Sequence, residues 1–351
     1  MRLIRLTLLL ATVIGVVGCS YTNPGSSSRA LLSGDASSKA DSPAFYRQMF
    51  VAFLHSPGGG HGQVAVFRNT ANGNVAPLRV LVGPDTGLFH PSSVATDDFG
   101  NMWVANGTSS DATASLTVYS SGASGDTPPT STVKGDRTQL FAPTGIATRG
   151  TTIYVASTGN RANGGSACEC ILEFNRFQKG NAVPIAVIGG PDTRITQPRG
   201  IFVDPGGSIW VADSDNEILA FSYGSNGDVA PFIDITGPNT LLNGDEALAQ
   251  NGSEEVFVAQ QGSYLAFARG ANGDATPVAD VTGPATDMVG SAEGIDLKGS
   301  DVYVSFWNNC TCTDGVKTFP QNANGNVAPL RDLKGRRTGF NRFMLKNVIV
   351  P

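Results

Sequence analysis

A unit of about fifty residues recurs six times along this chain of 351 residues, and it constrains the fold more than any other feature. In each copy a Gly is followed four residues later by a Pro, and successive glycines lie 46 to 55 residues apart. The best-preserved part is the stretch Ala-Asn-Gly-Asn-Val-Ala-Pro-Leu-Arg, which begins identically at Ala71 and at Ala323. Such a period predicts an array of similar supersecondary units. The repeated glycines are Gly73, Gly125, Gly180, Gly227, Gly273 and Gly325.

Each unit has the pattern of four short strands. Apolar residues alternate in stretches such as 116–119, and each stretch ends at an aromatic residue six positions before the Gly. The Asn-Gly or Ser-Gly step favours a tight hairpin turn. The Pro that follows suits the first residue of an outer strand, because Pro cannot donate to a ladder. A Pro-x-Gly-Ile strand, as at 143–147, and a strand ending in Val-Ala, as at 153–156, complete the unit.

Four strands in this length are typical of a β-propeller blade. The Pro-x-Gly-Ile, Tyr-Val-Ala-Asp/Asn and Val-x-Phe elements resemble those of NHL-repeat six-bladed β-propellers in their bacterial secreted form, from Phe50 to the C-terminus. Residues 49–52 match a Val-Ala strand that lacks its inner neighbour, and residues 343–348 match that missing strand. We therefore predict an all-β, six-bladed propeller over 46–351. Five whole blades span about 91–335, and the C-terminal strand completes the blade that three N-terminal strands begin.

Residues 1–19 have the pattern of a bacterial lipoprotein signal peptide. Arg2 and Arg5 precede an apolar run from Leu6 to Val17, which is short for a membrane span. The run leads into Gly18-Cys19 and resembles a lipobox, which implies that Cys19 is lipidated; the alternative is an ordinary signal peptide with an incidental Cys. Residues 20–45 are rich in Ser, Gly and Ala and predict a flexible tether.

The same resemblance implies a place in the bacterial envelope. Ser20 after the Cys is typical of lipoproteins delivered to the outer membrane, on its periplasmic or its surface side. The chain would then contact the membrane through lipid alone. Charged residues make up 15% of the chain, the formal net charge is −5 and no basic stripe is present, so nucleic acid is not an expected partner. We expect a monomer.

Two positions in every unit are expected at the mouth of the central channel, where the innermost strands converge. One follows the loop Pro and the other follows Val-Ala. Together they predict an arc rich in carboxylates, and His90 is expected at the rim; the alternative is a set of solvated strand starts with Arg199 paired to its neighbours. The first position holds Ser92, Thr144, Arg199, Glu246, Glu293 and Phe343, and the second holds Asn106, Ser157, Asp213, Gln260, Phe306 and Phe53.

A second, more distant resemblance concerns metal binding. In gluconolactonase-like propellers, a Glu-Gly at the start of the innermost strand supplies a ligand to a catalytic divalent metal. Glu293-Gly294 resembles that local pattern, with Glu246 one blade earlier, and this implies a possible site for Ca²⁺, Mg²⁺ or Mn²⁺. The wider pattern of that family is not visible. Asp97, Asp204 and Asp296 are interpreted as residues that form the inner hairpin turns.

The remaining cysteines form two Cys-x-Cys pairs, Cys168 with Cys170 and Cys310 with Cys312. The pairs fall in corresponding loops of the second and fifth whole blades, which face each other across a six-bladed ring. Outside the cytoplasm, disulfides within each pair are the simplest expectation. Bridges across the channel, or four thiolates around a soft metal, remain alternatives.

These features favour a binding module. The sequence contains no Gly-x-Ser-x-Gly elbow and no Walker-type phosphate loop. We predict a non-catalytic propeller that recognises a protein, peptide or glycan through the face that carries the cysteines. The alternatives are a lactonase, hydrolase or lyase that depends on a divalent metal, and a structural protein of the envelope.

Overall fold

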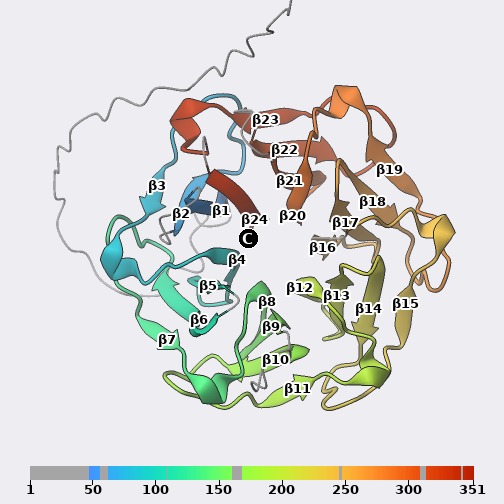
Figure 1. Ribbon diagram of the computed structural model, residues 1–351. Coiled ribbons are helices and arrows are strands. Elements are labelled where there is room, and N and C mark those ends of the chain that lie inside the picture. The colour runs from blue at the N-terminus through green and yellow to red at the C-terminus, as the bar shows by residue number, and fades with distance from the viewer. Residues whose placement is uncertain are drawn as a thin grey trace, which may run out of the picture. The chain divides into compact units, whose positions relative to one another are not determined.

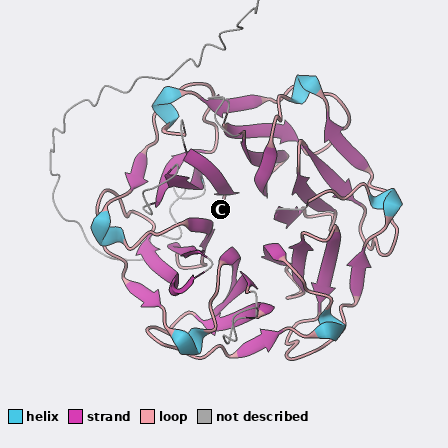
Figure 2. Ribbon diagram, in the orientation of Figure 1, coloured by secondary structure: helices cyan, strands magenta, loops and turns pink. Residues whose placement is uncertain are grey.

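The computed structural model describes residues 47–55, 62–108, 110–159, 168–244, 247–308, 314–340 and 343–351. Six four-stranded antiparallel sheets surround a central axis as the blades of a propeller (Figure 1). The helices of the described residues are single 3-10 turns, one at each outer corner of the ring (Figure 2). Across the part of the chain that the structure describes, no helix is long and apolar enough to cross a membrane.

The blades follow one another in chain order around the axis. The closing blade contains β24 (Phe343–Ile349), β1 (Gln48–His55), β2 (Gly62–Arg68) and β3 (Arg79–Leu81). The next two contain β4 (Pro91–Thr96), β5 (Asn101–Thr108), β6 (Ser110–Ser120) and β7 (Ser131–Val133), then β8 (Pro143–Arg149), β9 (Thr152–Thr158), β10 (Glu169–Asn175) and β11 (Ala186–Ile188). The last three contain β12 (Pro198–Val203), β13 (Ile209–Asp213), β14 (Glu217–Phe221) and β15 (Ile233–Ile235), then β16 (Ala247–Gln250), β17 (Val256–Gln260), β18 (Ser263–Phe267) and β19 (Ala279–Thr282), and finally β20 (Ser291–Lys298), β21 (Asp301–Trp307), β22 (Gly315–Pro320) and β23 (Arg331–Lys334).

The predicted closure of the ring is confirmed. Strand β24 pairs antiparallel with β1, with Val51 opposite Val348 and Phe50 opposite Ile349. The five whole blades begin at Pro91 and end at Lys334, as the repeat indicates. Closure leaves no unpaired inner strand.

The core lies between neighbouring blades, because each sheet buries both faces against the next sheet. Alternate residues of β10 illustrate this: Leu172 and Phe174 face the preceding blade, whereas Ile171 packs with Phe221 of the following blade. The aromatic residue that precedes each repeated Gly is at most 1% exposed in every blade. These six aromatic residues are Phe67, Tyr119, Phe174, Phe221, Phe267 and Phe319.

A buried Thr shapes every connection from an outermost strand to the next innermost strand. Thr86 donates through Oγ1 to the carbonyl of Gly83 at 2.7 Å and accepts from the amide of Leu88 at 3.2 Å. Gly83 has φ of 142°, which side chains disfavour, so the turn requires Gly there. The same arrangement closes the 3-10 turns η2 (Pro84–Thr86), η3 (Asp136–Thr138), η5 (Pro191–Thr193), η6 (Pro238–Thr240), η7 (Pro284–Thr286) and η8 (Arg336–Thr338).

The repeated Asn-Gly-Asn element joins each blade to the blade before it. The amide of Gly73 donates to the carbonyl of Asp332 at 2.9 Å, and Asn74 accepts through Oδ1 from the amide of Arg337 at 2.7 Å. Equivalent bonds occur at all six blade boundaries. The element is therefore an inter-blade clasp within the connection 69–78, and the tight hairpin turn predicted at Asn-Gly is wrong, because the chain turns earlier, where the amide of Ala71 donates to the carbonyl of Arg68. Its two identical copies belong to neighbouring blades, since Gly73 lies in the closing blade and Gly325 in the blade before it.

Candidate functional site

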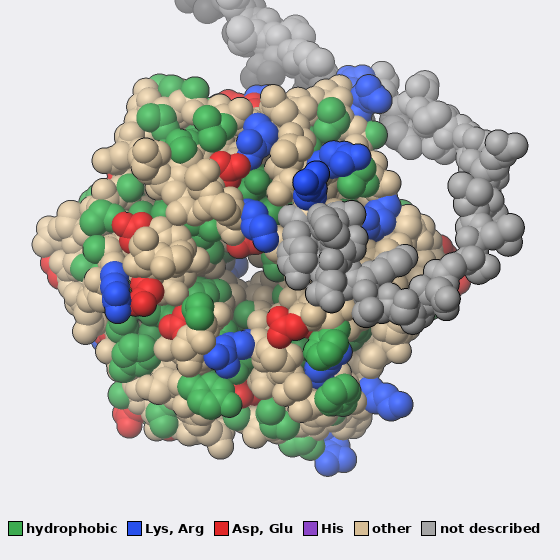
Figure 3. Space-filling view, turned by 180° about the vertical axis from the view of Figure 1, so that it is seen from behind, with side chains coloured by type: hydrophobic (Ala, Val, Ile, Leu, Met, Phe, Trp, Pro, Cys, Tyr) green, Lys and Arg blue, Asp and Glu red, His purple; other side chains and the backbone are tan. Residues whose placement is uncertain are grey.

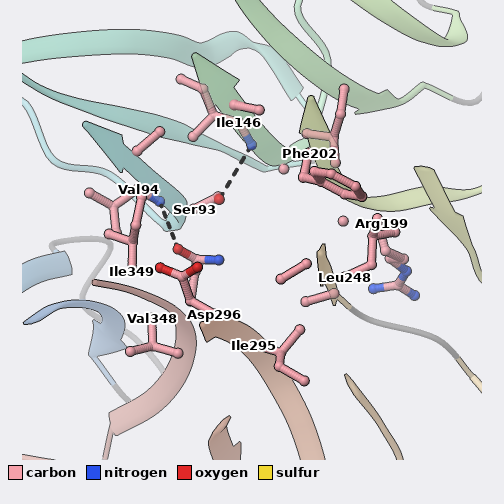
Figure 4. Close-up of a pocket in the computed structure, with 18 of the residues that line it drawn as sticks. Ser93, Val94, Ile146, Arg199, Phe202, Leu248, Ile295, Asp296, Val348 and Ile349 are labelled. Atoms are coloured by element: carbon pink, nitrogen blue, oxygen red, sulfur yellow. Dashed lines mark hydrogen bonds between the residues drawn. The ribbon is translucent and has the colours of Figure 1, made fainter. Parts of the chain in front are cut away.

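The six innermost strands surround a channel along the propeller axis. Its cavity has a volume of about 260 Å³ and is lined by β4, β8, β12, β16, β20 and β24 (Figure 4). Aliphatic and aromatic side chains such as Ile146, Phe202 and Ile295 form much of the wall. Arg199 and the carboxyl of Asp296 lie on different sides of it (Figure 4).

Among the described residues, a register irregularity in the innermost strand of five blades directs one side chain toward the mouth of this channel. In β4, Pro91 pairs with Asn106 and Ser93 pairs with Ala105, so Ser92 has no partner in β5. Bulges of this kind re-aim a side chain. Five such residues line a second cavity, of about 250 Å³, together with His90. These five mouth residues are Ser92, Thr144, Arg199, Glu293 and Lys346.

Lys346 replaces the residue that the sequence pattern placed in this set. The repeat assigned Phe343 to the position, but Phe53 pairs with Leu345 and Ala52 pairs with Asn347, which leaves Lys346 at the irregularity. The Pro-x-Gly-Ile marker is missing from the C-terminal strand, so no residue pattern indicates its register. Pairing with β1 fixes it instead.

The mouth contains one close ion pair among its described residues. Lys346 Nζ lies 2.7 Å from Glu293 Oε2, and the Glu293 side chain is 8% exposed. Arg199 donates through Nε to Ser214 Oγ at 2.7 Å. The charged side chains among the described mouth residues are Arg199, Glu293 and Lys346, and the expected carboxylate-rich arc stays a prediction because Glu246 lies outside the described residues.

The shorter side chains at the mouth join neighbouring blades. The hydroxyl of Thr144 donates to the carbonyl of Pro198 at 2.6 Å, and the hydroxyl of Ser92 donates to the carbonyl of Pro143. Both bonds run from one blade to the next. Ser92 and Thr144 are therefore held in place, and they present a rigid wall to the cavity.

Asn106 and Asp213 lie beneath the mouth loops, and neither of them lines the two cavities. Both side chains are fully buried. Asn106 Oδ1 accepts from the amide of Phe89 at 3.2 Å, and Asp213 Oδ2 accepts from the amides of Thr196 and Gln197 at 2.9 and 3.0 Å. The residue after Val-Ala thus fixes the loop before the innermost strand, which positions His90 and Arg199 indirectly.

The interpretation of the inner hairpin turns is confirmed for two of the three aspartates. Asp97 and Asp204 accept bonds from their own turns and from the indole N–H of a Trp six residues later. Asp296 differs, because β20 continues to Lys298 and places it inside the channel. It accepts from the amides of Leu297 and Val350, and burial raises its pKa to about 6.

The sulfurs of Cys168 and Cys170 lie within disulfide-bonding distance, and their Cα atoms are 5.2 Å apart. This pairing matches the local disulfide expected for this Cys-x-Cys. Several other predicted residues lie outside the described part of the chain. They are Cys19 with the tether, Glu246, Cys310 and Cys312.

The described donors do not fit a divalent cation at the mouth. No group of three or more His, Cys, Asp or Glu side chains occurs close together in the part of the chain that the structure describes. Glu293, the carboxylate that the resemblance pointed to, already accepts from the Lys346 ammonium. A hard divalent ion takes several oxygen ligands, and the described mouth residues do not supply them.

Comparisons with known proteins support the fold alone. No protein-family model and no curated protein matches the sequence. A protein from Bacteroides uniformis described as a candidate 6-phosphogluconolactonase aligns with TM-score 0.53 and 16% identity, over 81% of this chain and 82% of its own. The periplasmic gluconolactonase PpgL of Pseudomonas aeruginosa aligns with TM-score 0.52 and 16% identity, over 78% and 79%. Membership of the NHL-repeat family stays a prediction.

Proposed function

We propose that this protein is a binding module whose channel mouth receives an acidic end or side group of a peptide or glycan. The observation that carries the proposal is that two cavities share Ser92, Thr144, Arg199 and Glu293. A ligand group that enters between the mouth residues therefore reaches the channel beneath them, whose wall combines apolar side chains such as Phe202 with polar ones such as Asp296. A cavity with apolar walls and a few converging polar groups is typical of ligand sites.

The charge and size of the site indicate the chemistry of the ligand. Each cavity, at 250 to 260 Å³, is slightly smaller than most sites for drug-sized molecules, so it suits one residue or sugar of a larger ligand. Arg199 and Lys346 bring two cationic side chains to the mouth, and Lys346 pairs with Glu293. A guanidinium favours carboxylates, which it binds through parallel hydrogen bonds.

The test compares acidic probes with neutral counterparts. The probes are a short peptide with a free C-terminal carboxylate and an oligosaccharide of uronic acids, each measured against its amide or neutral-sugar equivalent by calorimetry. We expect an acidic probe to bind, and Arg199→Gln to weaken it about tenfold or more. The matched control is Arg137→Gln, an exposed arginine of η3. Equal affinity for acidic and neutral probes, or equal affinity of the Arg199→Gln variant, would contradict the proposal.

A lactone hydrolase is the second candidate, supported by the two structural neighbours named for gluconolactonase activity. Hydrolysis of glucono-δ-lactone, measured with and without added Ca²⁺, Mg²⁺ or Mn²⁺, distinguishes the two candidates. Metal-dependent turnover that is lost in Glu293→Gln would favour the hydrolase. A rate equal to spontaneous hydrolysis under every condition would favour the binding module.

A further inference from the structure

The face opposite the channel mouth carries three exposed aromatic residues on three consecutive blades. Phe99, Phe177 and Tyr223 are 58%, 74% and 70% exposed. Antiparallel strands alternate in direction, so the turn β4–β5 and the connections β10–β11 and β14–β15 all lie at the end away from the mouth. We call these residues the aromatic row. Figure 3 shows hydrophobic and basic side chains side by side on one face of the propeller.

Local bonds hold the aromatic row in place at the tips of its turns. Asp97 Oδ1 accepts from the amide of Phe99 at 3.0 Å, and Asn175 Oδ1 accepts from the amide of Phe177 at 3.0 Å. Both are Asx turns, which fix the backbone beneath an aromatic residue. The Tyr223 ring lies against Gly207, where an added Cβ would approach within 2.9 Å of Cδ2. Binding through these rings would therefore cost little conformational entropy, because the backbone beneath them is already fixed.

Arginine side chains lie between the rings. The guanidinium carbon of Arg176 lies 3.4 Å from the centroid of the Phe99 ring and 5.2 Å from that of Phe177, and the carbon of Arg149 lies 5.9 Å from that of Tyr223. The Arg176 side chain is 12% exposed, and its buried Nη1 has no hydrogen-bond partner among the described residues. Exposed Lys179 follows in the same connection. Arg176 Nη2 also lies 3.7 Å from Asp97 Oδ2, so Arg149 and Lys179 provide the basic character beside the rings, and the carboxylate of Asp98 is exposed next to Phe99.

The chain enters the propeller at this same end. Arg47 precedes β1, the second strand of its blade, and its carbonyl accepts from the amide of Asn69 in the β2–β3 connection. Residues 20–46 separate this point from Cys19, and the flexible tether predicted from their sequence would have a root-mean-square span of about 30 Å. If Cys19 is lipidated, as its sequence context implies, the tether would hold this face close to the membrane.

We propose that the aromatic row docks on the anionic lipid surface to which Cys19 anchors the chain. Aromatic side chains at the tips of turns enter the interfacial region of a bilayer, and basic residues beside them attract anionic headgroups. Separate rings on three blades suit an extended plane better than a single narrow ligand. The row lies at the end opposite the channel mouth, so the proposal does not depend on the ligand proposed above.

Vesicle co-sedimentation tests the proposal with the chain from Ser20 to Pro351, which lacks the lipid. All six sheets consist of residues from Gln48 onward, so the leader is not needed for the fold. The probes are vesicles of phosphatidylcholine alone and of phosphatidylcholine mixed with phosphatidylglycerol. We expect binding to the mixed vesicles, weakened about tenfold or more by the double variant Phe177→Ser/Tyr223→Ser.

The matched control is Val289→Ser, which removes an apolar side chain that is 55% exposed in the connection between η7 and β20, at the mouth end, and should leave vesicle binding unchanged. Thermal unfolding verifies that each variant is folded, and unchanged probe binding at the mouth separates this proposal from the proposed function. Absence of wild-type binding to mixed vesicles, or equal binding by the double variant, would overturn it. Equal binding to both vesicle types would overturn the anionic preference, and binding to polysaccharide instead of vesicles would reassign the face to glycans.

Discussion

Glu173 provides a direct test of the energetics of this fold. It lies on β10 between Tyr154 of β9 and Ala186 of β11, and it is 7% exposed. Its Oε1 has no hydrogen-bond partner among the described residues, and burial raises its pKa from 4.5 to about 7. On the same face of β10, Ile171 belongs to an apolar cluster between two blades. The carboxylate form is therefore costly in the folded protein.

The sign of the effect follows from proton binding. Between the unfolded and the folded pKa the folded protein holds a proton that the unfolded chain has lost, so stability falls as pH rises. The difference between 4.5 and about 7 corresponds to about 3 kcal/mol, and solvent screening of a side chain that is not completely buried reduces this to about 2 kcal/mol. Glu173→Gln keeps the shape of the protonated acid and removes the titration.

The assay is urea unfolding of the wild type and of Glu173→Gln at about pH 4, below the unfolded pKa, and at about pH 8. We expect nearly equal stabilities at the lower pH and an advantage of about 2 kcal/mol for Glu173→Gln at the higher pH. Because the two proteins share every other titrating group, including Asp296, those contributions cancel in the comparison. Stability curves that stay parallel between the two pH values would refute the reasoning and show that the carboxylate is solvated.

Three further predictions concern other described residues. Lys317 is fully buried and its Nζ lies 2.7 and 2.9 Å from carboxylate oxygens of Asp287 and Asp332, so Lys317→Met should lower the free energy of unfolding by about 3 kcal/mol in urea titrations. Unchanged stability would show that Lys334, which contacts both carboxylates, is enough to balance their charge. Asp213→Ala removes the acceptor of the Thr196 and Gln197 amides, and should lower the free energy of unfolding by about 2 kcal/mol and weaken probe binding through displacement of Arg199. Unaltered calorimetric affinity would contradict the positioning role. Unreduced peptide mass spectrometry should find the peptide containing Cys168 and Cys170 lighter by their two thiol hydrogens, whereas free thiols would contradict the local disulfide.

The repeat predicts the architecture well because it records the contacts between blades. The repeated Gly, the residue after it and the buried Thr each form the same bond at every boundary, so their spacing reports the number of blades directly. The aromatic residue before each Gly marks a buried strand for the same reason. Closure by the C-terminal strand follows because the N-terminal blade lacks an innermost strand and one such strand is left over at the C-terminal end.

The mouth is predicted less completely, because side-chain direction depends on register and burial. Arg199 and Glu293 follow a recognisable strand start, and the structure places both at the mouth. Lys346 was missed because its strand carries no marker, and Asp296 was misread because the length of β20 decides whether it lies in a turn or in the channel. Asn106 and Asp213 look like ligands in sequence, since a polar residue at a strand end does not reveal that a loop covers it.

Because the same clasp joins every pair of neighbouring blades, the blade in which the chain begins and ends is partly arbitrary. The boundary between the last and first blades is closed by the same bonds, from Gly73 and Asn74, that close the other five. Strands β24 and β1, which contain the two ends of the described chain, pair within one sheet. A circular permutant that links Pro351 to Gln48 and opens between Ala268 and Asn272 on the outer rim should therefore assemble the same ring. The two copies of the nine-residue stretch would still join neighbouring blades, although the chain would begin and end in another blade.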